Sequence, residues 1–351
     1  MQTLEAVNAI VNTIKNNIEK IGRQLRIIEV CGTHTVSIYR NGFHTLFKGY
    51  IDFISGPGCP VCVTHEGYID NLIELAKMNY TIYTFGDLLK VPGKNMSLAE
   101  AKAEGAKIKI MYSPVDTVEN ISADEEAIIA AVGFETTVPV FALSLEKVLE
   151  KDLKNVKFAC ELKTIDQPLK VLLKDHIKVD GLILPGHVAT ILGVDGFKFV
   201  EEFKLPSVIS GFEKYDILFS LLSLTQSILN NDFTVKNEYK RVVKKEGNTV
   251  AKRYIERFFE RTDAYFRGLG LIEGGGLRLK SEYSAFSVQL KYEYESLSNS
   301  ACRCTDVLTG KLKPFECPLF EKVCTPQTPK GACMVSQEGS CNAYFRYGKW
   351  K

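Results

Sequence analysis

The chain has 351 residues, of which 45% are hydrophobic and 25% are charged, a balance typical of a folded globular protein. This composition excludes a disordered or fibrous chain, and the length is enough for two or three domains. The 44 basic and 42 acidic residues nearly cancel, so the charge predicts neither a nucleic-acid nor a membrane partner. No apolar run is long enough to span a membrane, and the first residues lack the features of a signal peptide, so we expect a cytoplasmic protein.

Short apolar segments alternate with helical ones along the first two thirds of the chain. An amphipathic helix is predicted over 4–21, where apolar residues recur at spacings of three and four. Strands are predicted at 26–30, 50–54, 80–85, 107–111, 127–132, 156–160, 181–184 and 208–209. This alternation is typical of parallel sheets with crossover helices. We therefore expect an α/β fold in which two tandem parallel-sheet domains, 1–112 and 113–234, face a cleft.

From residue 235 onward the pattern changes. A helical segment with a solvated basic face is predicted over 236–267, and glycines between 268 and 276 indicate a turn region. Six of the ten cysteines lie in the last 50 residues, where four prolines disfavour regular structure. We expect a third domain, 235–351, whose cysteine-rich part depends on metal bonds for its shape.

Polar residues follow the carboxyl ends of four predicted strands, where open parallel sheets bind their ligands. These residues are Cys31 with His34, Cys59 with Cys62, Glu135 with Thr136 and Thr137, and His187. Taken alone, the Glu135 segment is also explained by helix capping, and His187 by the start of a helix. Because the four positions are equivalent in the pattern, we expect them to meet in the cleft between the two sheets.

Two early cysteine motifs indicate thiol chemistry. Cys59-Pro-Val-Cys62 has the spacing of a thioredoxin-like redox pair, with half of a zinc site as the alternative. The rigid Gly56-Pro-Gly58 turn should present this pair outward. Cys31, at the start of a helix, should have a lowered thiol pKa and can act as a nucleophile or as a soft ligand for a low-valent metal. A small buried hydrophobe is the equally supported alternative for Cys31.

The C-terminal cysteines predict a metal centre. The four expected ligands are Cys302, Cys317, Cys324 and Cys341. Two additional donors are Cys304 and Cys333. Four thiolates suit an iron–sulfur cluster or tetrahedral zinc, and the spacing matches neither common ferredoxin pattern. We favour a cluster because a redox-active dithiol elsewhere in the chain needs an electron source. There is no P-loop and no dinucleotide fingerprint in the sequence, so neither ATP nor NAD is indicated.

These motifs resemble those of the HypD family of [NiFe]-hydrogenase maturation proteins, over essentially the whole chain. The matching segments are Cys31-Gly-Thr-His34, Gly56-Pro-Gly-Cys-Pro-Val-Cys-Val-Thr64, Gly133-Phe-Glu-Thr-Thr137, Pro185-Gly-His-Val188, Cys317 to Cys324, Gly331-Ala-Cys-Met-Val-Ser336, Glu338-Gly339 and Cys341. So many motifs in the same order make a chance agreement negligible.

The resemblance implies a scaffold on which the Fe(CN)2CO unit of the hydrogenase active site is assembled, rather than a conventional turnover enzyme. Two α/β domains would enclose a cleft, and a third would carry a [4Fe-4S] cluster resembling that of ferredoxin–thioredoxin reductase. Cys31 would hold the iron together with a cysteine of a small HypC-like chaperone. A HypE-like partner would supply cyanide, and the hydrogenase large subunit would be served indirectly.

The resemblance also implies roles for the other motifs. Cys59 and Cys62 would form the redox pair, with electrons passing through the cluster. The residues implied to line the site are Glu135, Thr136, Thr137 and His187. The extra thiols of Cys304 and Cys333 leave the four cluster ligands open. A stand-alone thiol–disulfide oxidoreductase fed by an iron–sulfur cluster and a zinc-stapled binding protein are the alternative hypotheses.

Overall fold

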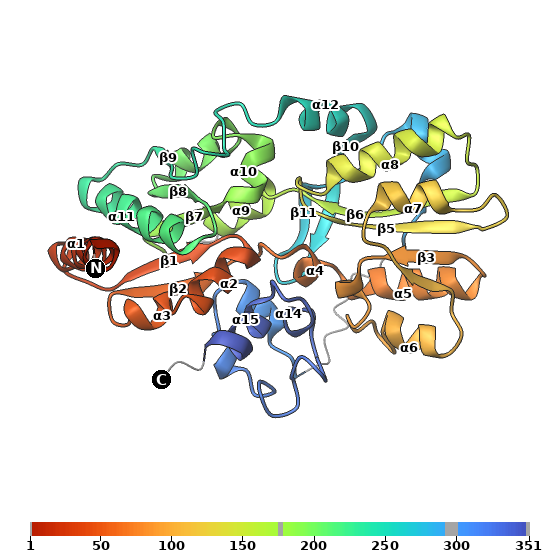
Figure 1. Ribbon diagram of the computed structural model, residues 1–351. Coiled ribbons are helices and arrows are strands. Elements are labelled where there is room, and N and C mark those ends of the chain that lie inside the picture. The colour runs from red at the N-terminus through yellow and green to blue at the C-terminus, as the bar shows by residue number, and fades with distance from the viewer. Residues whose placement is uncertain (1, 175–177, 292–300, 349–351) are drawn as a thin grey trace.

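The computed structural model describes residues 2–174, 178–291 and 301–348, and it contains two sheets side by side with a small cysteine-rich module beneath them (Figure 1). The first sheet has five parallel strands in the order β2-β1-β7-β8-β9. Its strands are β1 (Leu25–Glu29), β2 (Ile51–Ser55), β7 (Gly181–Pro185), β8 (Ser207–Ser210) and β9 (Val235–Asn237).

The second sheet has six strands in the order β10-β11-β6-β5-β3-β4. Its strands are β3 (Thr81–Thr84), β4 (Ile108–Ile110), β5 (Ala127–Gly133), β6 (Val156–Lys163), β10 (Phe259–Phe266) and β11 (Gly270–Leu279). Strands β3 to β6 run parallel, whereas β10 and β11 form an antiparallel hairpin whose second strand pairs with β6. The predicted α/β class with two sheets is confirmed.

Helices connect the strands and flank the sheets. The longer ones are α1 (Gln2–Ile21), α2 (Gly32–Arg40), α5 (Glu66–Lys77), α8 (Val138–Glu150), α9 (Asp166–Lys174), α11 (Lys214–Asn230) and α12 (Thr249–Phe258). The shorter ones are α3 (Phe43–Leu46), α4 (Pro60–Val63), α6 (Leu98–Ala103), α7 (Pro114–Asn120), α10 (Gly186–Leu192), α13 (Cys304–Leu308), α14 (Ala332–Val335) and α15 (Ser340–Tyr347). The described residues also form the 3-10 segments η1 (Gly86–Leu88), η2 (Asp195–Phe203), η3 (Ser281–Phe286) and η4 (Pro314–Glu316). Among the described residues, none of the helices has the length and apolar character that crossing a membrane requires.

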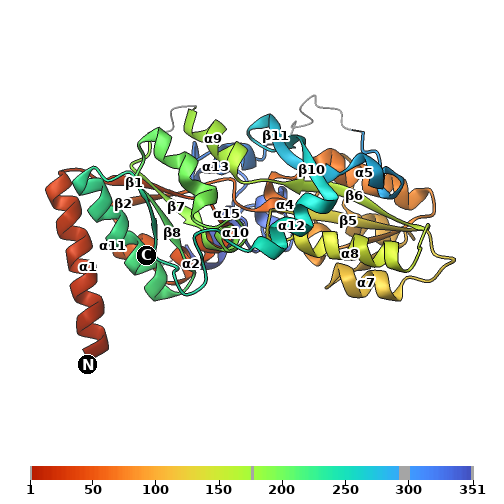
Figure 2. The same cartoon turned by 90° about the horizontal axis from the view of Figure 1, so that it is seen from above.

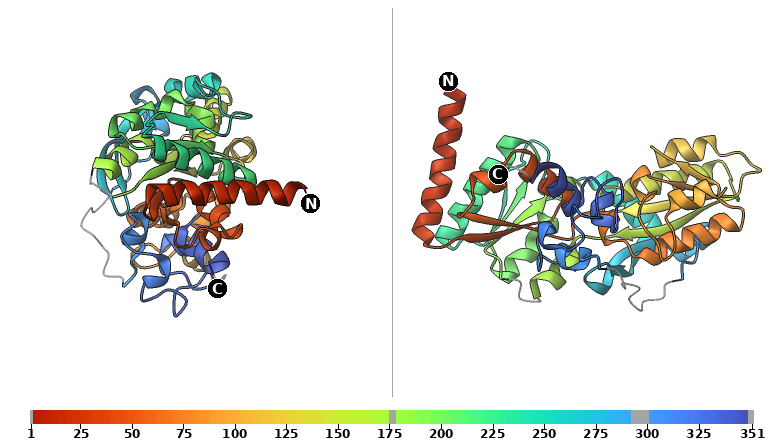
Figure 3. Two further views of the ribbon diagram at one scale, coloured as in Figure 1. Left: turned by 90° about the vertical axis from the view of Figure 1, so that its left-hand side faces the viewer. Right: turned by 90° about the horizontal axis from the view of Figure 1, so that it is seen from below.

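Burial explains the apolar runs in the sequence. Every residue of β5 and of β7 is buried, as expected for parallel strands covered on both faces. Helix α1 buries one stripe, Val11, Ile14 and Ile18, in the core that it shares with α11. The N-terminal end of α1 extends beyond the body of the molecule (Figures 2 and 3).

The division of the strands between the two sheets differs from the predicted one. Strand β1 pairs with β7, with Ile27 opposite Gly181, and not with the strands that follow it at 81–84 and 108–110. The chain passes from the first sheet to the second after β2, returns after β6 and crosses again after β9. The expected boundaries at 112 and 234 therefore do not separate the sheets. Alternation of strands and helices predicts parallel pairing, but it does not specify which strands become neighbours.

The segment after β9 also differs from its prediction. Only α12 is helical within the region expected to be a basic helix; residues 238–248 before it are turns and irregular backbone, and Phe259–Phe266 after it form the first strand of the β10–β11 hairpin. Gly268 and Gly270, with φ of +92° and +81°, make the tight turn. The hairpin buries Phe259, Leu277 and Leu279 in the core of the second sheet, so tertiary packing decides its conformation.

The cysteine-rich module, 301–348, lies against the edge of the first sheet, in contact with α2 and α4 (Figures 1 and 3). Lys313 Nζ donates hydrogen bonds to Asp52 Oδ1 at 2.6 Å and to the carbonyl oxygen of Phe53 at 2.5 Å. Because β2 is an edge strand, these contacts cover an edge that would otherwise be open.

Candidate thiol site and cysteine-rich cavity

Cys31 lies between β1 and α2, where it is the N-cap residue of the helix. Its side chain is 8% exposed, and burial, followed by the negative charge of Glu338, raises the thiol pKa to about 12. The backbone N–H groups of Thr33 and His34 donate hydrogen bonds to the sulfur and oppose this rise. The predicted lowering of the Cys31 pKa is therefore wrong, because the helix terminus lies inside the protein.

Cys59 and Cys62 are joined by a disulfide across the single turn of α4, with their Cα atoms 5.2 Å apart. The backbone N–H of Cys62 also donates a hydrogen bond to the Cys59 sulfur at 3.2 Å. The two residues are 3% and 0% exposed, so the expectation that the turn presents the pair outward is wrong. Helix α14 of the cysteine-rich module packs on α4 and covers it.

The Cys31 and Cys59 loops touch each other. A Cβ added at Gly58 would lie 2.3 Å from the carbonyl oxygen of Val30 and 2.5 Å from the backbone nitrogen of Cys31. The N–H of Gly56 donates to the carbonyl oxygen of Glu29 at 2.7 Å. Because glycine allows this close approach, the disulfide and Cys31 belong to one site, as the sequence pattern predicts.

A buried carboxyl group that was not predicted from the sequence supports this site. Glu29 ends β1, and its Oε2 accepts a hydrogen bond from the N–H of Cys31 at 3.2 Å. The hydroxyl of Thr35 donates to the other oxygen. Burial raises the Glu29 pKa to about 8, so the carboxyl is largely neutral at pH 7. The sequence feature that could have identified Glu29 is its position, at the end of an apolar strand and directly before the cysteine motif.

A stack of three rings closes the side of the site formed by β7 and β8. The Phe212 ring lies between those of His34 and His187, with centroid distances of 4.5 and 3.9 Å. His34 Nε2 lies 3.2 and 3.1 Å from the carbonyl oxygens of Ser210 and Gly211, so this nitrogen carries the proton. Burial lowers the His34 pKa to about 4, and its Nδ1 has no hydrogen-bond partner among the described residues. The structure therefore brings the two predicted histidines together.

The segment after β5 approaches the dithiol helix from the second sheet. Thr136 and Thr137 are half-buried, and Thr137 lines a cavity of about 390 Å3 together with Pro60 of α4. The Thr137 side chain does not cap α8, so the capping interpretation does not hold there. Glu135 points elsewhere: its Oε1 accepts a hydrogen bond from the N–H of Ile165 at 2.9 Å. Burial raises the Glu135 pKa to about 7.

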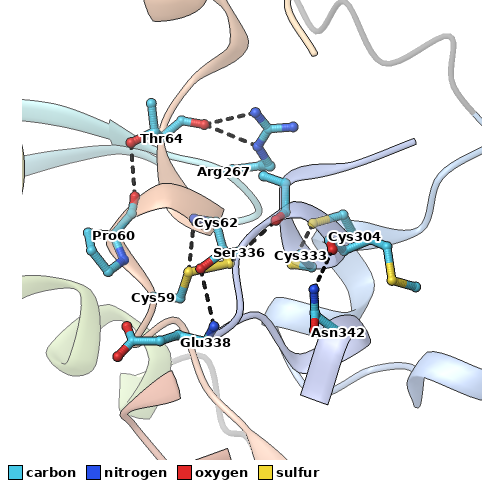
Figure 4. Close-up of a disulfide and its surroundings, with 12 residues drawn as sticks. Cys59, Pro60, Cys62, Thr64, Arg267, Cys304, Cys333, Ser336, Glu338 and Asn342 are labelled. Atoms are coloured by element: carbon cyan, nitrogen blue, oxygen red, sulfur yellow. Dashed lines mark hydrogen bonds between the residues drawn. A yellow bond between two sulfur atoms is a disulfide. The ribbon is translucent and has the colours of Figure 1, made fainter. Parts of the chain in front are cut away.

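Glu338 brings the cysteine-rich module into the thiol site. Its Oε1 accepts a hydrogen bond from the Thr33 hydroxyl at 2.6 Å, and its backbone lies directly against Gly32. Figure 4 shows Glu338 beside Cys59. The pKa of Asp87 is raised by burial and, to a lesser extent, by the charge of Glu338. The sequence places Glu338 in a motif without indicating a role for it, and it gives no signal for Asp87.

The six C-terminal cysteines line one cavity. They are Cys302, Cys304, Cys317, Cys324, Cys333 and Cys341. Other cavity walls are the apolar side chains of Val307, Phe320 and Met334. A cavity lined by sulfur and apolar atoms is suited to a metal–sulfur centre rather than to a polar ligand.

Two of these cysteines are in direct contact. The sulfur atoms of Cys304 and Cys333 are 2.7 Å apart, and this hydrogen bond is the main reason that the Cys304 pKa is lowered to about 7. A Cβ at Gly331 would lie 2.6 Å from the Cys302 sulfur, so glycine lets the loop pass the cavity. Across 2–174, 178–291 and 301–348, no three His, Cys, Asp or Glu side chains form a group suited to a single metal ion. The four expected ligands stay a prediction.

Comparisons with known proteins agree with these features. A family model described as HypD, the hydrogenase formation hypA family, matches residues 5–348. The hydrogenase maturation factor HypD of Escherichia coli strain K12 is 40% identical over 334 residues, which cover 93% of this chain and 90% of the relative. The proteins of the same name from Rhodobacter capsulatus and Rhizobium leguminosarum bv. viciae are each 39% identical, over 339 and 345 residues. These matches cover 93% and 94% of this chain and 90% of each relative.

The family match extends over the thiol site and the cysteine-rich cavity alike. Both the α/β sheets and the C-terminal module fall inside the matched residues. The resemblance noted in the sequence is thereby confirmed, and the chain belongs to the HypD family of hydrogenase formation proteins.

Proposed function

We propose that this protein is a hydrogenase maturation factor that serves as the scaffold on which the Fe(CN)2CO unit is assembled. The observation that carries the proposal is that three thiol features lie together. The loops of Cys31 and of the Cys59–Cys62 disulfide touch each other, and helix α14, which carries Cys333 of the cysteine-rich cavity, packs on α4. The names of the relatives support the maturation role. In this proposal the iron is a substrate, which the protein binds and then transfers, and not a resident cofactor.

Cys31 is the proposed iron ligand on this chain, with a HypC-like chaperone supplying a second thiolate. Its thiol is protonated in the closed site, since burial raises its pKa to about 12. Binding of a soft, low-valent iron deprotonates a coordinating thiol, so the proton leaves as the metal enters. The neutral ring of His34 and the largely neutral carboxyl of Glu29 hold the loop while adding little charge.

Cys59 and Cys62 are the proposed redox pair. Reduction of their disulfide takes two electrons and two protons and gives two thiols next to Cys31. A [4Fe-4S] cluster would supply single electrons at the cysteine-rich cavity, held by Cys302, Cys317, Cys324 and Cys341. In such a cluster each iron takes one cysteine, so four thiols around a cavity fit it without meeting at one point. A HypE-like cyanide donor and, indirectly, the hydrogenase large subunit complete the proposed partners.

The decisive experiment is an infrared spectrum of the protein purified anaerobically with its small chaperone. We expect cyanide and carbon monoxide bands in the wild-type complex and their loss in Cys31→Ala, with the absorbance of the iron–sulfur cluster unchanged. Cys160→Ala, a substitution outside the site, serves as the matched control and keeps the bands. Unchanged bands in Cys31→Ala would reject Cys31 as the iron ligand.

The alternative of a stand-alone thiol–disulfide oxidoreductase is disfavoured by burial. An oxidoreductase acting on protein disulfides must expose its attacking sulfur to a second protein. Here Cys59 is 3% exposed and Cys62 is 0% exposed, and both lie beneath the cysteine-rich module. A pair enclosed in this way is suited to a partner inside the same chain.

A further inference from the structure

The turn of the β10–β11 hairpin contacts the end of the dithiol helix through Arg267. Its backbone N–H donates to the carbonyl oxygen of Val63 at 2.9 Å. Its guanidinium donates through Nε and Nη2 to the carbonyl oxygen of Thr64, at 3.1 and 2.9 Å. Figure 4 shows these side-chain bonds above the Cys59–Cys62 disulfide. Arg267 thus caps the helix that carries the redox pair.

The Arg267 side chain is held on its other side as well. Its Nη2 lies 3.3 Å from Glu66 Oε2, and the two side chains are only 14% and 19% exposed. The next residue, Gly268, has φ of +92° and lies so close to α13 that an added Cβ would be 3.2 Å from the carbonyl oxygen of Thr305. The turn at 267–269 therefore bridges the dithiol helix and the cysteine-rich module.

Helix α4 needs this external support. It has only four residues, which is too short for a helix to be stable by its own hydrogen bonds. The carbonyl groups at its C-terminal end have no partners within the helix, and a charged donor is a strong one for them. A fixed positive charge near the helix that carries the cysteines also favours a thiolate over a thiol, and hence the reduced pair over the disulfide.

We propose that Arg267 is a positioning residue for the redox pair, which holds the end of α4 in place and makes the Cys59–Cys62 disulfide easier to reduce. The inference rests on the redox role proposed above for this pair. In the reaction, the S–S bond accepts two electrons and two protons from a dithiol reductant and gives two thiols, one of which can then lose its proton to form the thiolate that a nearby positive charge favours. The reductant closes to its own cyclic disulfide, so electrons and protons balance.

The test measures the equilibrium between this disulfide and dithiothreitol in the full-length protein. The redox state of the 59–62 peptide is read by thiol alkylation and mass spectrometry, which separates it from the other cysteines. In Arg267→Met we expect the equilibrium constant for reduction to fall about tenfold, equivalent to about 30 mV for a two-electron couple. Arg267→Lys keeps the charge and should recover the wild-type constant to within about threefold.

The matched control is Arg278→Met on the same hairpin, whose guanidinium pairs with Glu260 at the surface. It should leave the constant unchanged. An unchanged constant in Arg267→Met, or the same shift in Arg278→Met, overturns the proposal.

Glu66→Gln gives a second test whose expected shift has the opposite sign. It removes the carboxylate that partly neutralises Arg267, so the disulfide should become easier to reduce, about threefold in the same equilibrium. If Arg267→Met does not fold, this variant tests the proposal in its place. An equilibrium constant for reduction that falls, or that does not change, overturns the proposal. The proposed function is tested by a separate experiment. If Cys59→Ser supports normal hydrogenase maturation, the redox role of the pair is wrong, whatever equilibrium constant is measured for the Arg267 variants.

Discussion

Glu135 is a buried carboxyl group with one satisfied oxygen. Its Oε1 accepts a hydrogen bond from the N–H of Ile165, whereas Oε2 has no hydrogen-bond partner among the described residues. Burial raises its pKa from 4.5 to about 7 in the folded protein. Between these two values the folded state keeps a proton that the unfolded chain releases. The contribution of Glu135 to stability is therefore complete below about pH 4.5 and is lost as the pH rises toward 7.

Glu135→Gln should remove this pH dependence, because the amide keeps an oxygen for Ile165 and carries no charge. We expect the free energy of unfolding of the variant, relative to wild type, to rise by about 3 kcal/mol between pH 4.5 and 8. Urea unfolding at both pH values measures it. Glu126→Gln, at an exposed glutamate directly before β5, is the control and should follow wild type at both pH values. An equal response of the two variants would contradict the assigned pKa.

Cys59→Ser separates the chemistry of the redox pair from its contribution to the fold. The disulfide joins residues three apart, so it closes a very short loop and restricts the unfolded chain little. We expect hydrogenase maturation to be lost while the thermal midpoint falls by only a few degrees. Cys160→Ser is the control, because this cysteine lies in β6 outside the site. Maturation at the wild-type level in Cys59→Ser would exclude the dithiol mechanism.

At the level of elements, the position of α4 depends on a backbone contact rather than on a side chain. Gly58 lies against the peptide group that joins Val30 to Cys31, and both sides of the contact are backbone. Flexible side chains can yield to an added methyl group, but two loops of backbone cannot do so without shifting. The spacing between the dithiol and Cys31 is thus determined by the absence of one Cβ atom.

Gly58→Ala should therefore destabilise the protein by roughly 2–3 kcal/mol and move the two loops apart. Urea unfolding gives the free energy, and infrared bands of the chaperone complex report whether the iron site still forms. Gly86→Ala is the matched control, since a Cβ there would meet only a side-chain carbon at 3.8 Å. If both substitutions cost the same free energy, the close contact at Gly58 does not determine the geometry.

The positions of most strands could be predicted because parallel strands are apolar throughout. Strand β5 was expected at 127–132 and is observed as Ala127–Gly133. The pairing of β1 with β7 could not be predicted, because the two strands are about 150 residues apart and their contact is decided by packing. The β10–β11 hairpin was missed for a related reason: its residues become a strand only against β6.

The candidate site was predicted in its residue types but not in its burial. Cysteine and histidine carry their chemistry in the side chain, so Cys59 could be identified from its spacing to Cys62, and Cys31 from its position after a predicted strand. That both are covered by the module containing Glu338 depends on contacts more than 270 residues apart in the chain. Arg267 had no sequence signal, because it acts through backbone carbonyl groups that any residue provides.

At the level of the whole molecule, the cysteine-rich module is attached to the first sheet by a lysine. Lys313 donates to Asp52 Oδ1 and to the carbonyl oxygen of Phe53, both in the edge strand β2. Its side chain is 30% exposed, so the ion pair is only partly screened by solvent. The hydrogen bond between Thr33 and Glu338 is a further attachment, in addition to the packing of the module on α2 and α4.

Lys313→Met should loosen the module without unfolding the sheets. We expect a loss of about 1–2 kcal/mol, together with faster amide hydrogen exchange in β2 and in the module. Exchange measured by mass spectrometry distinguishes these segments from β5 in the second sheet. Lys322→Met, an exposed lysine of the same module, should behave like wild type. Uniformly faster exchange in both sheets would mean that the module does not dock independently.

The three crossings of the chain between the sheets, after β2, β6 and β9, affect how the molecule can deform. A pair of lobes linked by one connection swings open about a single pivot, whereas three connections must all flex together, and this permits only a shallow rotation. If the protein binds a metal as proposed, the metal would then reach the thiols by movement of the small module away from the sheets rather than by separation of the two sheets. Because the two sheets are stiffly connected, Cys31 and the Cys59–Cys62 pair would keep their relative positions while the module moves.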